Sequence, residues 1–252
     1  MTDQDNGKWM LELANNVLER IARSEPLQET LTHVVVELEA LNPDMVCSIL
    51  LLDEAGTHLG LGAGPSVPKA FSQAIDGVAI GPGVGSCGTA AFTGQEVSVV
   101  DISSDPLWKD YAALALENGL QACWSSPLLS SARRVLGTFA VYYRTPRTAT
   151  KSEREQIASV TNLVAIAIER DRESASLAAS LAELKRWYEA TLGRESRVLE
   201  LKKEVNALLA RLGESPRYLN AGDDEGSATP KSDHLSIAAI VRADGRDSRG
   251  EA

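Results

Sequence analysis

Gly81-Pro-Gly-Val-Gly-Ser-Cys-Gly-Thr-Ala90 is the segment around which the fold prediction is built. It holds four glycines in eight residues, and glycine is unfavourable inside a helix because it loses the most backbone entropy there. We therefore predict a tight loop that leads into a short helix, with Ser86 as its N-cap and Gly94 as its stop. The N-terminus of such a helix directs free N–H groups and a partial positive charge toward a ligand. Cys87 lies in the first turn, so we expect its thiol to ionise more readily than an ordinary cysteine.

Apolar periodicity on both sides of this loop predicts a series of helices and strands. Helical spacing and capping signals, such as Asp105-Pro106 before Gly119 and the box Ser152-x-x-Glu155, predict helices over 8–23, 27–41, 66–77, 105–118 and 152–170. Runs rich in branched residues predict strands over 45–52, 58–64, 95–101, 120–129 and 135–143. Strands gathered into one sheet with helices packed on it favour an α+β fold around an antiparallel sheet.

A different pattern follows residue 170. Apolar residues are spaced as in the seam of a coiled coil, first at Leu177, Leu181, Leu184, Tyr188 and Thr191, and then at Val198, Leu201, Val205, Leu208 and Leu212. The two series are out of phase, so we expect a stutter or a break at Gly193. A single amphipathic helix cannot bury its own stripe. The pattern favours dimerisation, and the alternative is a helix folded back on its own domain.

These patterns divide the chain into four parts. We predict an N-terminal helix over 1–26, a sensory domain over 27–170 and a coiled-coil extension over 171–213. The final part, 214–252, is rich in Gly, Asp, Ser and Arg, and this composition predicts disorder.

Composition and charge exclude several classes of function. The net charge is −10, which argues against nucleic acid, whose binding needs a basic face, and gives no support for binding to an anionic membrane surface. No apolar run approaches the roughly 20 residues of a membrane helix, and the N-terminus lacks the pattern of a signal peptide. Three cysteines far apart do not form a disulfide framework, so we expect a cytoplasmic protein. His33, His58 and His234 match no metal-binding spacing, and we predict neither a metal site nor a catalytic constellation.

Five segments together resemble the GAF domain, a small-molecule-sensing module of bacterial signalling proteins. The resemblance covers about 27–170 and is carried by Gly81-Pro-Gly-Val-Gly-Ser-Cys-Gly-Thr-Ala-Ala-Phe92, Val100-Asp-Ile-Ser-Ser-Asp-Pro-Leu-Trp108, Leu120-Gln-Ala-Cys-Trp-Ser-Ser-Pro-Leu128, Leu136-Gly-Thr-Phe-Ala-Val-Tyr-Tyr143 and Ala165-Ile-Ala-Ile-Glu-Arg170. It implies a GAF-like antiparallel six-stranded sheet flanked by helices, which the long coiled-coil extension follows. It also implies a ligand pocket on one face of the sheet and a homodimer through the N-terminal and C-terminal helices.

This resemblance leads to a function prediction of a sensor without catalytic output. No kinase, cyclase or DNA-binding segment is recognisable in the sequence, so we expect the output to lie in a partner such as a sensor kinase or response regulator. The identity of the small-molecule ligand, and of any cofactor, stays open. Tryptophan walls with a few hydroxyl and thiol groups are typical of such pockets, and the candidate ligand-binding residues are Ser86, Cys87, Thr89, Trp108, Tyr111, Trp124 and Ser126.

A thiol-based function is the alternative. Cys87 and Cys123 resemble two cysteines of the GAF-type free methionine-R-sulfoxide reductases, and the resemblance implies that Cys123 attacks and Cys87 resolves. The acidic residues of that family are replaced here by Ser125, Ser126, Ala140 and Tyr142. A redox switch that uses the same two thiols needs no such carboxylate, and a third interpretation treats both cysteines as small buried apolar residues.

Overall fold

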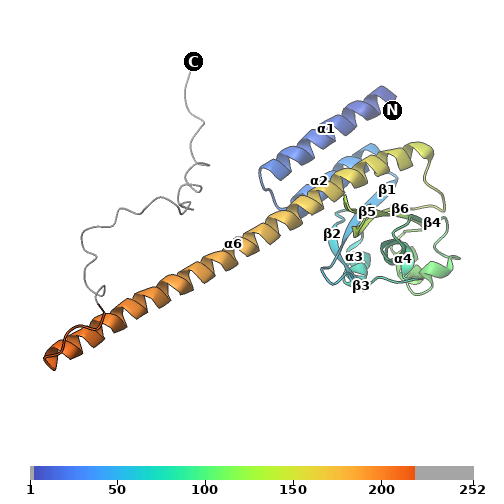
Figure 1. Ribbon diagram of the computed structural model, residues 1–252. Coiled ribbons are helices and arrows are strands. Elements are labelled where there is room, and N and C mark those ends of the chain that lie inside the picture. The colour runs from blue at the N-terminus through green and yellow to red at the C-terminus, as the bar shows by residue number, and fades with distance from the viewer. Residues whose placement is uncertain (1–2, 219–252) are drawn as a thin grey trace, which may run out of the picture. The chain divides into compact units, whose positions relative to one another are not determined.

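The computed structural model describes residues 3–218 of the 252-residue chain, which divides into two compact units, Met1–Ala179 and Ser180–Ala252. Each unit is considered separately. All the described strands lie in the first unit, together with every described helix except the C-terminal part of the last (Figure 1). The helical elements are α1 (Asp3–Ala22), α2 (Leu27–Leu41), α3 (Lys69–Ile75), α4 (Gly85–Thr93), the 3-10 turn η1 (Pro106–Trp108), α5 (Ala112–Glu117) and α6 (Lys151–Arg211).

Six strands form one antiparallel sheet, as the resemblance to the GAF domain implied. They are β1 (Met45–Leu52), β2 (His58–Ala63), β3 (Val78–Ala79), β4 (Val97–Val99), β5 (Ala122–Leu129) and β6 (Val135–Tyr143). The order across the sheet is β3-β2-β1-β6-β5-β4, which makes β3 and β4 the edge strands. β6 lies at the centre, where it pairs with β1 and β5 along almost its whole length. The short β3 was not expected from the sequence.

Helices cover both faces of this sheet (Figure 1). On one side lie α1, α2 and the first turns of α6, and we call this side the α2/α6 face. On the other side lie α3, α4, η1 and α5, and we call it the α4 face. Because side chains alternate along a strand, neighbours on β5 point to opposite faces. Cys123 belongs to the α4 face, whereas Trp124 belongs to the α2/α6 face.

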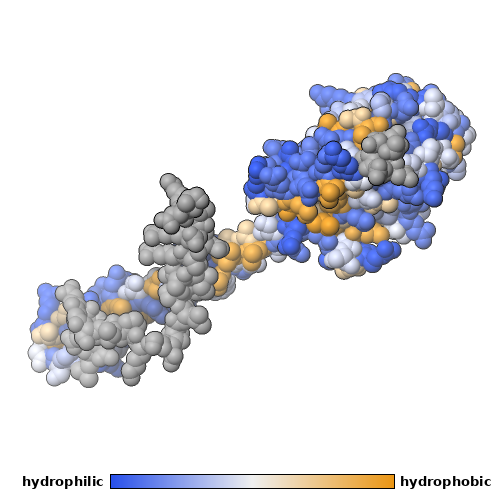
Figure 2. Space-filling model, turned by 90° about the horizontal axis from the view of Figure 1, so that it is seen from above, coloured by the Kyte–Doolittle hydropathy of each residue, from blue (hydrophilic) through white to orange (hydrophobic). Residues whose placement is uncertain are grey.

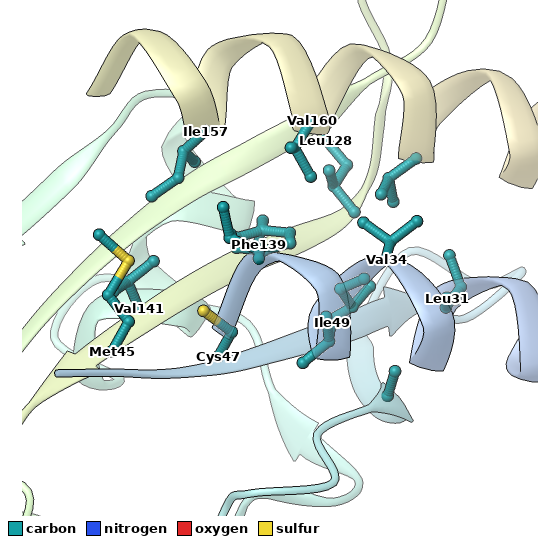
Figure 3. Close-up of a cluster of buried hydrophobic side chains, with 14 of the residues drawn as sticks. Leu31, Val34, Met45, Cys47, Ile49, Leu128, Phe139, Val141, Ile157 and Val160 are labelled. Carbon is teal, nitrogen blue, oxygen red and sulfur yellow. The ribbon is translucent and has the colours of Figure 1, made fainter. Parts of the chain in front are cut away.

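The α2/α6 face carries a continuous apolar core (Figure 3). Side chains from α2, α6 and the three central strands meet there, and Figure 3 labels Leu31, Val34, Met45, Cys47, Ile49, Leu128, Phe139, Val141, Ile157 and Val160. All of these are buried. Full burial of one such aliphatic or aromatic side chain contributes about 1.5–3 kcal/mol, so this layer is a main source of stability.

Two of the predicted helix starts need correction. Ser86 is not an N-cap, because α4 begins one residue earlier at Gly85 and no side chain caps it. The box at Ser152 is also displaced: Glu153 accepts from the Thr150 N–H at 2.6 Å, and the Thr150 hydroxyl accepts from the Glu153 N–H at 3.3 Å. The capping box therefore begins two residues before the expected one. The predicted stop of α4 is confirmed, since Gly94 has the left-handed φ of 65°.

The predicted helix over 105–118 is divided. Asp105 caps it as expected by accepting from the Leu107 N–H at 2.9 Å, but the chain forms only the three-residue turn η1 before α5 starts at Ala112. Asn118 then forms the C-cap, and Gly119 follows with a φ of 75°. The helix is interrupted where Trp108 turns into the space beside α4.

In the second unit α6 continues without interruption to Arg211, so a break at Gly193 is wrong, whereas a stutter at that position stays a prediction. Most of its apolar side chains are exposed, and Figure 2 shows orange patches among the charged surface of this part of the chain. Two residues of the predicted disordered part are held in place, because the Arg217 and Tyr218 N–H groups both donate to Asn206 Oδ1 at 3.0 Å. The rest of that prediction, 219–252, lies outside the described residues.

Candidate ligand site beside Cys87

The loop before α4 turns sharply because two of its glycines adopt left-handed backbone. Gly83 has a φ of 83° and Gly85 a φ of 54°, a region that other residues rarely enter. Gly88 is needed for a different reason: a Cβ at this position would lie 2.8 Å from the Val84 Cβ and 3.2 Å from the Ala79 carbonyl oxygen. The glycines thus allow the loop to fold back over the first turn of α4, which places Ser86 and Cys87 in the buried layer.

A small cavity lies between this turn and the α4 face of the sheet. Its volume is about 30 Å³, and it is lined by Leu50, Phe71, Ile75, Val78, Val84, Gly85, Ser86, Cys87, Gly88, Trp108, Tyr111 and Tyr142. One water needs roughly 10–15 Å³ of such space, whereas sites for small ligands span about 300–1,000 Å³. The cavity therefore has room for water alone in the state that the structure shows.

Three aromatic rings fill most of the space in front of α4. Trp108 is only 3% exposed, and its indole Nε1–H donates to Ser86 Oγ at 2.9 Å. The Phe71 ring lies nearly parallel to the indole, at 11° with centroids 6.3 Å apart. Tyr142 meets Phe71 edge-on at 5.5 Å. Offset and edge-on pairs of this kind are favourable beyond their buried area, so the cluster closes the site.

Two thiols lie close together at the site, and Cys87 lines the cavity itself. The Cys87 sulfur is 3.9 Å from the Tyr142 hydroxyl, and Cys123, which is on β5, neighbours both Cys87 and Tyr142. The Cys123 thiol is the largest cause that lowers the pKa of Cys87 to about 7, and desolvation opposes this shift. Burial raises the pKa of Cys123 and that of Tyr142. Near neutral pH Cys87 is thus the one of the three that carries a substantial fraction of negative charge.

The α4 face also contains buried hydroxyl groups. Ser48 Oγ lies 3.4 Å from the Tyr142 hydroxyl, which gives both a partner. Ser125 Oγ and Thr138 Oγ1 are buried without a hydrogen bond of normal geometry, although both hydroxyls contribute to the lowered pKa of Cys87. A buried polar group without a partner costs about 1–3 kcal/mol. The α4 face therefore keeps buried hydroxyl groups that reduce the stability of the fold.

The structure brings together four of the seven predicted ligand-binding residues. Ser86, Cys87, Trp108 and Tyr111 line the cavity. Thr89 lies on α4 outside the lining, and its hydroxyl is buried without a partner.

The other two residues are on the wrong side of the sheet. Trp124 packs into the α2/α6 core, and the Ser126 hydroxyl lies 3.5 Å from Glu96 at a separate surface groove. Cys123 and Trp124 are consecutive on a strand, so they cannot both face one site, and this alternation is the signal that sequence reasoning should have applied.

Sequence reasoning missed two aromatic members of the site, Phe71 and Tyr142. Tyr142 pairs directly with Cys123 across β5 and β6, so it shares the face of that thiol. Phe71 is fully buried on α3, a helix that the sequence predicted without assigning it a role. A signal existed for Tyr142. Residues two positions apart on a strand share a face, so Tyr142 must lie on the same face as Ala140. No pattern within the sequence indicated that Phe71 reaches the same place.

The model of the GAF domain family matches residues 24–169, which is more than half of the chain. The chain belongs to the GAF domain family. The match ends within α6, and the site beside Cys87 lies inside it.

Known proteins similar to this GAF domain chain include a curated relative and several solved structures. The methyl sulfide methyltransferase-associated sensor of Methanosarcina acetivorans is 38% identical over 169 residues, which are 67% of this chain but only 17% of that protein. The GAF domain of a phosphoenolpyruvate-protein phosphotransferase from Coxiella burnetii has a TM-score of 0.55 at 18% identity, covering 69% of this chain and 99% of the other. Free methionine-R-sulfoxide reductase from Neisseria meningitidis has a TM-score of 0.55 at 16% identity, covering 69% and 95%. At such low identity both structures show the fold alone.

Two kinds of feature are absent from residues 3–218. None of the helices there is both long and apolar enough to cross a membrane. That part of the chain also contains no group of three or more His, Cys, Asp or Glu side chains placed to hold a metal ion.

Proposed function

We propose that this GAF domain senses a small molecule in signal transduction of the two-component type, and that it has no catalytic output of its own. The observation that carries the proposal is the cavity beside Cys87, where three polar atoms converge within apolar walls: Ser86 Oγ, Cys87 Sγ and the Tyr142 hydroxyl. Apolar walls with a few convergent polar groups are the usual form of a small-molecule site. The name of the curated relative, a sensor, supports the same reading.

The receiver of the signal, on this proposal, is a sensor kinase or response regulator contacted through the helices. α6 packs on the sheet through Ile157, Val160 and Val164 and continues as one helix to Arg211. A ligand that shifts the sheet would therefore act on a helix that continues along the chain beyond the sensory domain. The curated relative is several times longer than this chain, which leaves room in that protein for further signalling segments.

A cavity-filling substitution tests the sensing proposal. Val78 is half-buried on edge strand β3 and lines the cavity, whereas Val97 is half-buried on edge strand β4 and does not. Purified full-length protein is denatured, and the small molecules released are identified by mass spectrometry. We expect a stoichiometric compound from the wild type and from Val97→Phe, and its loss from Val78→Phe. A compound retained equally by both variants would place the ligand elsewhere and contradict the proposal.

We propose further that the chain forms a homodimer through its N-terminal and C-terminal helices. Within the first unit, Leu11 and Leu18 are exposed on α1 one heptad apart, and Ile166 and Leu177 are exposed on α6. Within the second unit, the predicted seam residues Leu181, Leu184 and Tyr188 are exposed. A second copy of the chain is the partner that a coiled-coil seam of this spacing fits best.

Adjacent substitutions on α6 test the dimer. Leu181→Glu places a charge on the seam, and Ala182→Glu places the same charge one residue along, which turns it about 100° away from the seam. Light scattering should show a dimer for the wild type and for Ala182→Glu, and dissociation at least tenfold easier for Leu181→Glu. A wild-type monomer at tens of micromolar would refute this part of the proposal.

A second function is favoured by the contact between Cys87 and Cys123. In a peroxide-sensing switch, the Cys87 thiolate attacks one peroxide oxygen and releases hydroxide, which leaves a sulfenic acid. The Cys123 thiol then attacks that sulfur, a disulfide forms, and water is released. The lowered pKa of Cys87 supports it as the attacking residue, which reverses the roles implied by the reductase resemblance. Both cysteines are free thiols in this structure.

Mass spectrometry distinguishes these uses of the thiols. Treatment with hydrogen peroxide should lower the mass of the wild type by that of two hydrogens, because a disulfide forms. It should produce a sulfenic acid that can be trapped in Cys123→Ser but none in Cys87→Ser. Reduction of free methionine-R-sulfoxide is assayed in parallel with the same variants. Turnover by the wild type that Cys123→Ser abolishes would support the reductase instead, and an unchanged mass after peroxide would remove the switch.

A further inference from the structure

We propose that Trp108 is a built-in occupant of the ligand site, and that the external ligand is a flat heteroaromatic molecule with an N–H donor, of the indole type, which takes its place. This inference rests on the proposed sensing function, and it adds the chemical class of the ligand and the step by which it enters.

The first step of the argument is the size of the site. The cavity of about 30 Å³ has room for water only, yet aromatic side chains form much of its wall. A ligand of even two fused rings cannot enter unless one of those side chains leaves. The space that a ligand would occupy is therefore already filled by part of the protein.

The second step identifies the side chain that leaves. Tyr142 lies on the central strand β6 and Phe71 lies on α3, so both are fixed by regular secondary structure. Trp108 lies on the three-residue turn η1, and its backbone bonds to Asp105 and Tyr111 within the same segment. Short 3-10 turns between other elements open at lower cost than strands or α-helices. Trp108 can move out while the sheet and α4 keep their positions.

The third step derives the ligand class from what Trp108 satisfies. Its indole N–H is held by Ser86 Oγ at 2.9 Å, and Ser86 is completely buried. Its ring lies nearly parallel to the Phe71 ring. A molecule that replaces Trp108 must fill the same flat space and supply a donor to the same oxygen, because a buried hydroxyl that loses its partner is costly. An indole-like ring with one N–H meets both requirements.

Binding to an emptied site tests the ligand class. Indole and benzofuran have the same shape, but benzofuran has an oxygen where indole has the N–H. Titrated by calorimetry into full-length Trp108→Ala, indole should bind at least tenfold more tightly than to the wild type, and about tenfold more tightly than benzofuran. Adding Ser86→Ala should remove the preference for indole. Trp187→Ala, at an exposed tryptophan on α6, is the matched control and should behave as the wild type.

A second variant keeps the test decisive if the first one does not fold. Trp108→Leu leaves a smaller space and retains more packing, and it should show the same preference at lower affinity. No binding of indole to a folded variant, or equal binding of both compounds, would overturn the ligand class.

Displacement is measured in the wild-type chain. The indole N–H resonance of Trp108, assigned from the Trp108→Leu spectrum, should move to its solvent-exposed position at saturating indole, while that of Trp124 stays in place. Saturation that leaves the Trp108 resonance unmoved would overturn the replacement. The sensing proposal stands or falls separately on the Val78→Phe mass spectrometry, which requires no assumption about ligand class.

Discussion

The two faces of the central sheet differ in what they bury. The α2/α6 face is closed mainly by aliphatic and aromatic side chains such as Phe139 and Val141, although the Cys47 thiol and the Tyr143 hydroxyl are buried there too. The α4 face buries two thiols, a tyrosine hydroxyl, and serine and threonine hydroxyls, and it leaves a small cavity. The contrast teaches that the α4 face gathers its buried polar groups around a cavity, whereas the α2/α6 face packs its few polar groups among apolar side chains.

The largest expected effect is on the α2/α6 face. Phe139→Ala removes a ring from the middle of that core and should lower the free energy of unfolding by about 3–5 kcal/mol, as aromatic truncations do. Urea unfolding followed by circular dichroism measures the change. Phe92→Ala, at an exposed phenylalanine on α4, should cost less than about 0.5 kcal/mol. Equal losses of unfolding free energy in the two variants would contradict the assignment of Phe139 to the core and Phe92 to the surface.

The next effect concerns proton chemistry on the α4 face. The rate at which iodoacetamide alkylates Cys87 should rise with pH around a midpoint of about 7, because only the thiolate reacts. Cys123→Ala removes the main cause of the lowered pKa, so the midpoint should move up toward the ordinary 9.0 and the rate at pH 7 should fall on the order of tenfold. The thiolate then dominates only at higher pH. A midpoint that stays in place in Cys123→Ala would show that another group sets the pKa of Cys87.

The smallest effect compares two buried serines on the α4 face. Ser48 has a partner in Tyr142, whereas Ser125 has none of normal geometry. Ser48→Ala should therefore cost about 1 kcal/mol of unfolding free energy, and Ser125→Ala should be neutral or slightly stabilising. Thermal and urea unfolding of the pair would resolve this difference. A larger loss of unfolding free energy for Ser125→Ala would mean that the Ser125 hydroxyl has a hydrogen-bond partner. The buried hydroxyls of the α4 face would then not reduce stability.

Much of this architecture is predictable because local signals decide it. The strands over 45–52 and 135–143 are long apolar runs, and Asp105 and Gly94 perform the capping roles that their chemistry favours. Ser86 misled the prediction of a helix start, because positive φ values at Gly83 and Gly85 accompany an N-cap at Val84, two residues before the predicted one.

The site was less predictable because it depends on which face each side chain takes. Trp124 was assigned to the ligand by residue type, although strand alternation opposes it to Cys123. Phe71 joins Trp108 only through tertiary packing between α3 and η1, which no sequence spacing expresses. The hydrogen bond from the Trp108 indole to Ser86, which joins residues 22 positions apart, could likewise not be predicted from the sequence.

The central claim is that the α4 face, and not the α2/α6 face, receives the ligand. Chemical-shift mapping of the full chain against a library of small heteroaromatic compounds tests it most directly. The account predicts that binders shift the amide signals of Ser86 and Cys87 and the indole signal of Trp108, and leave Phe139 and Val160 unchanged. Binders that shift the α2/α6 core and leave the first turn of α4 untouched would contradict it.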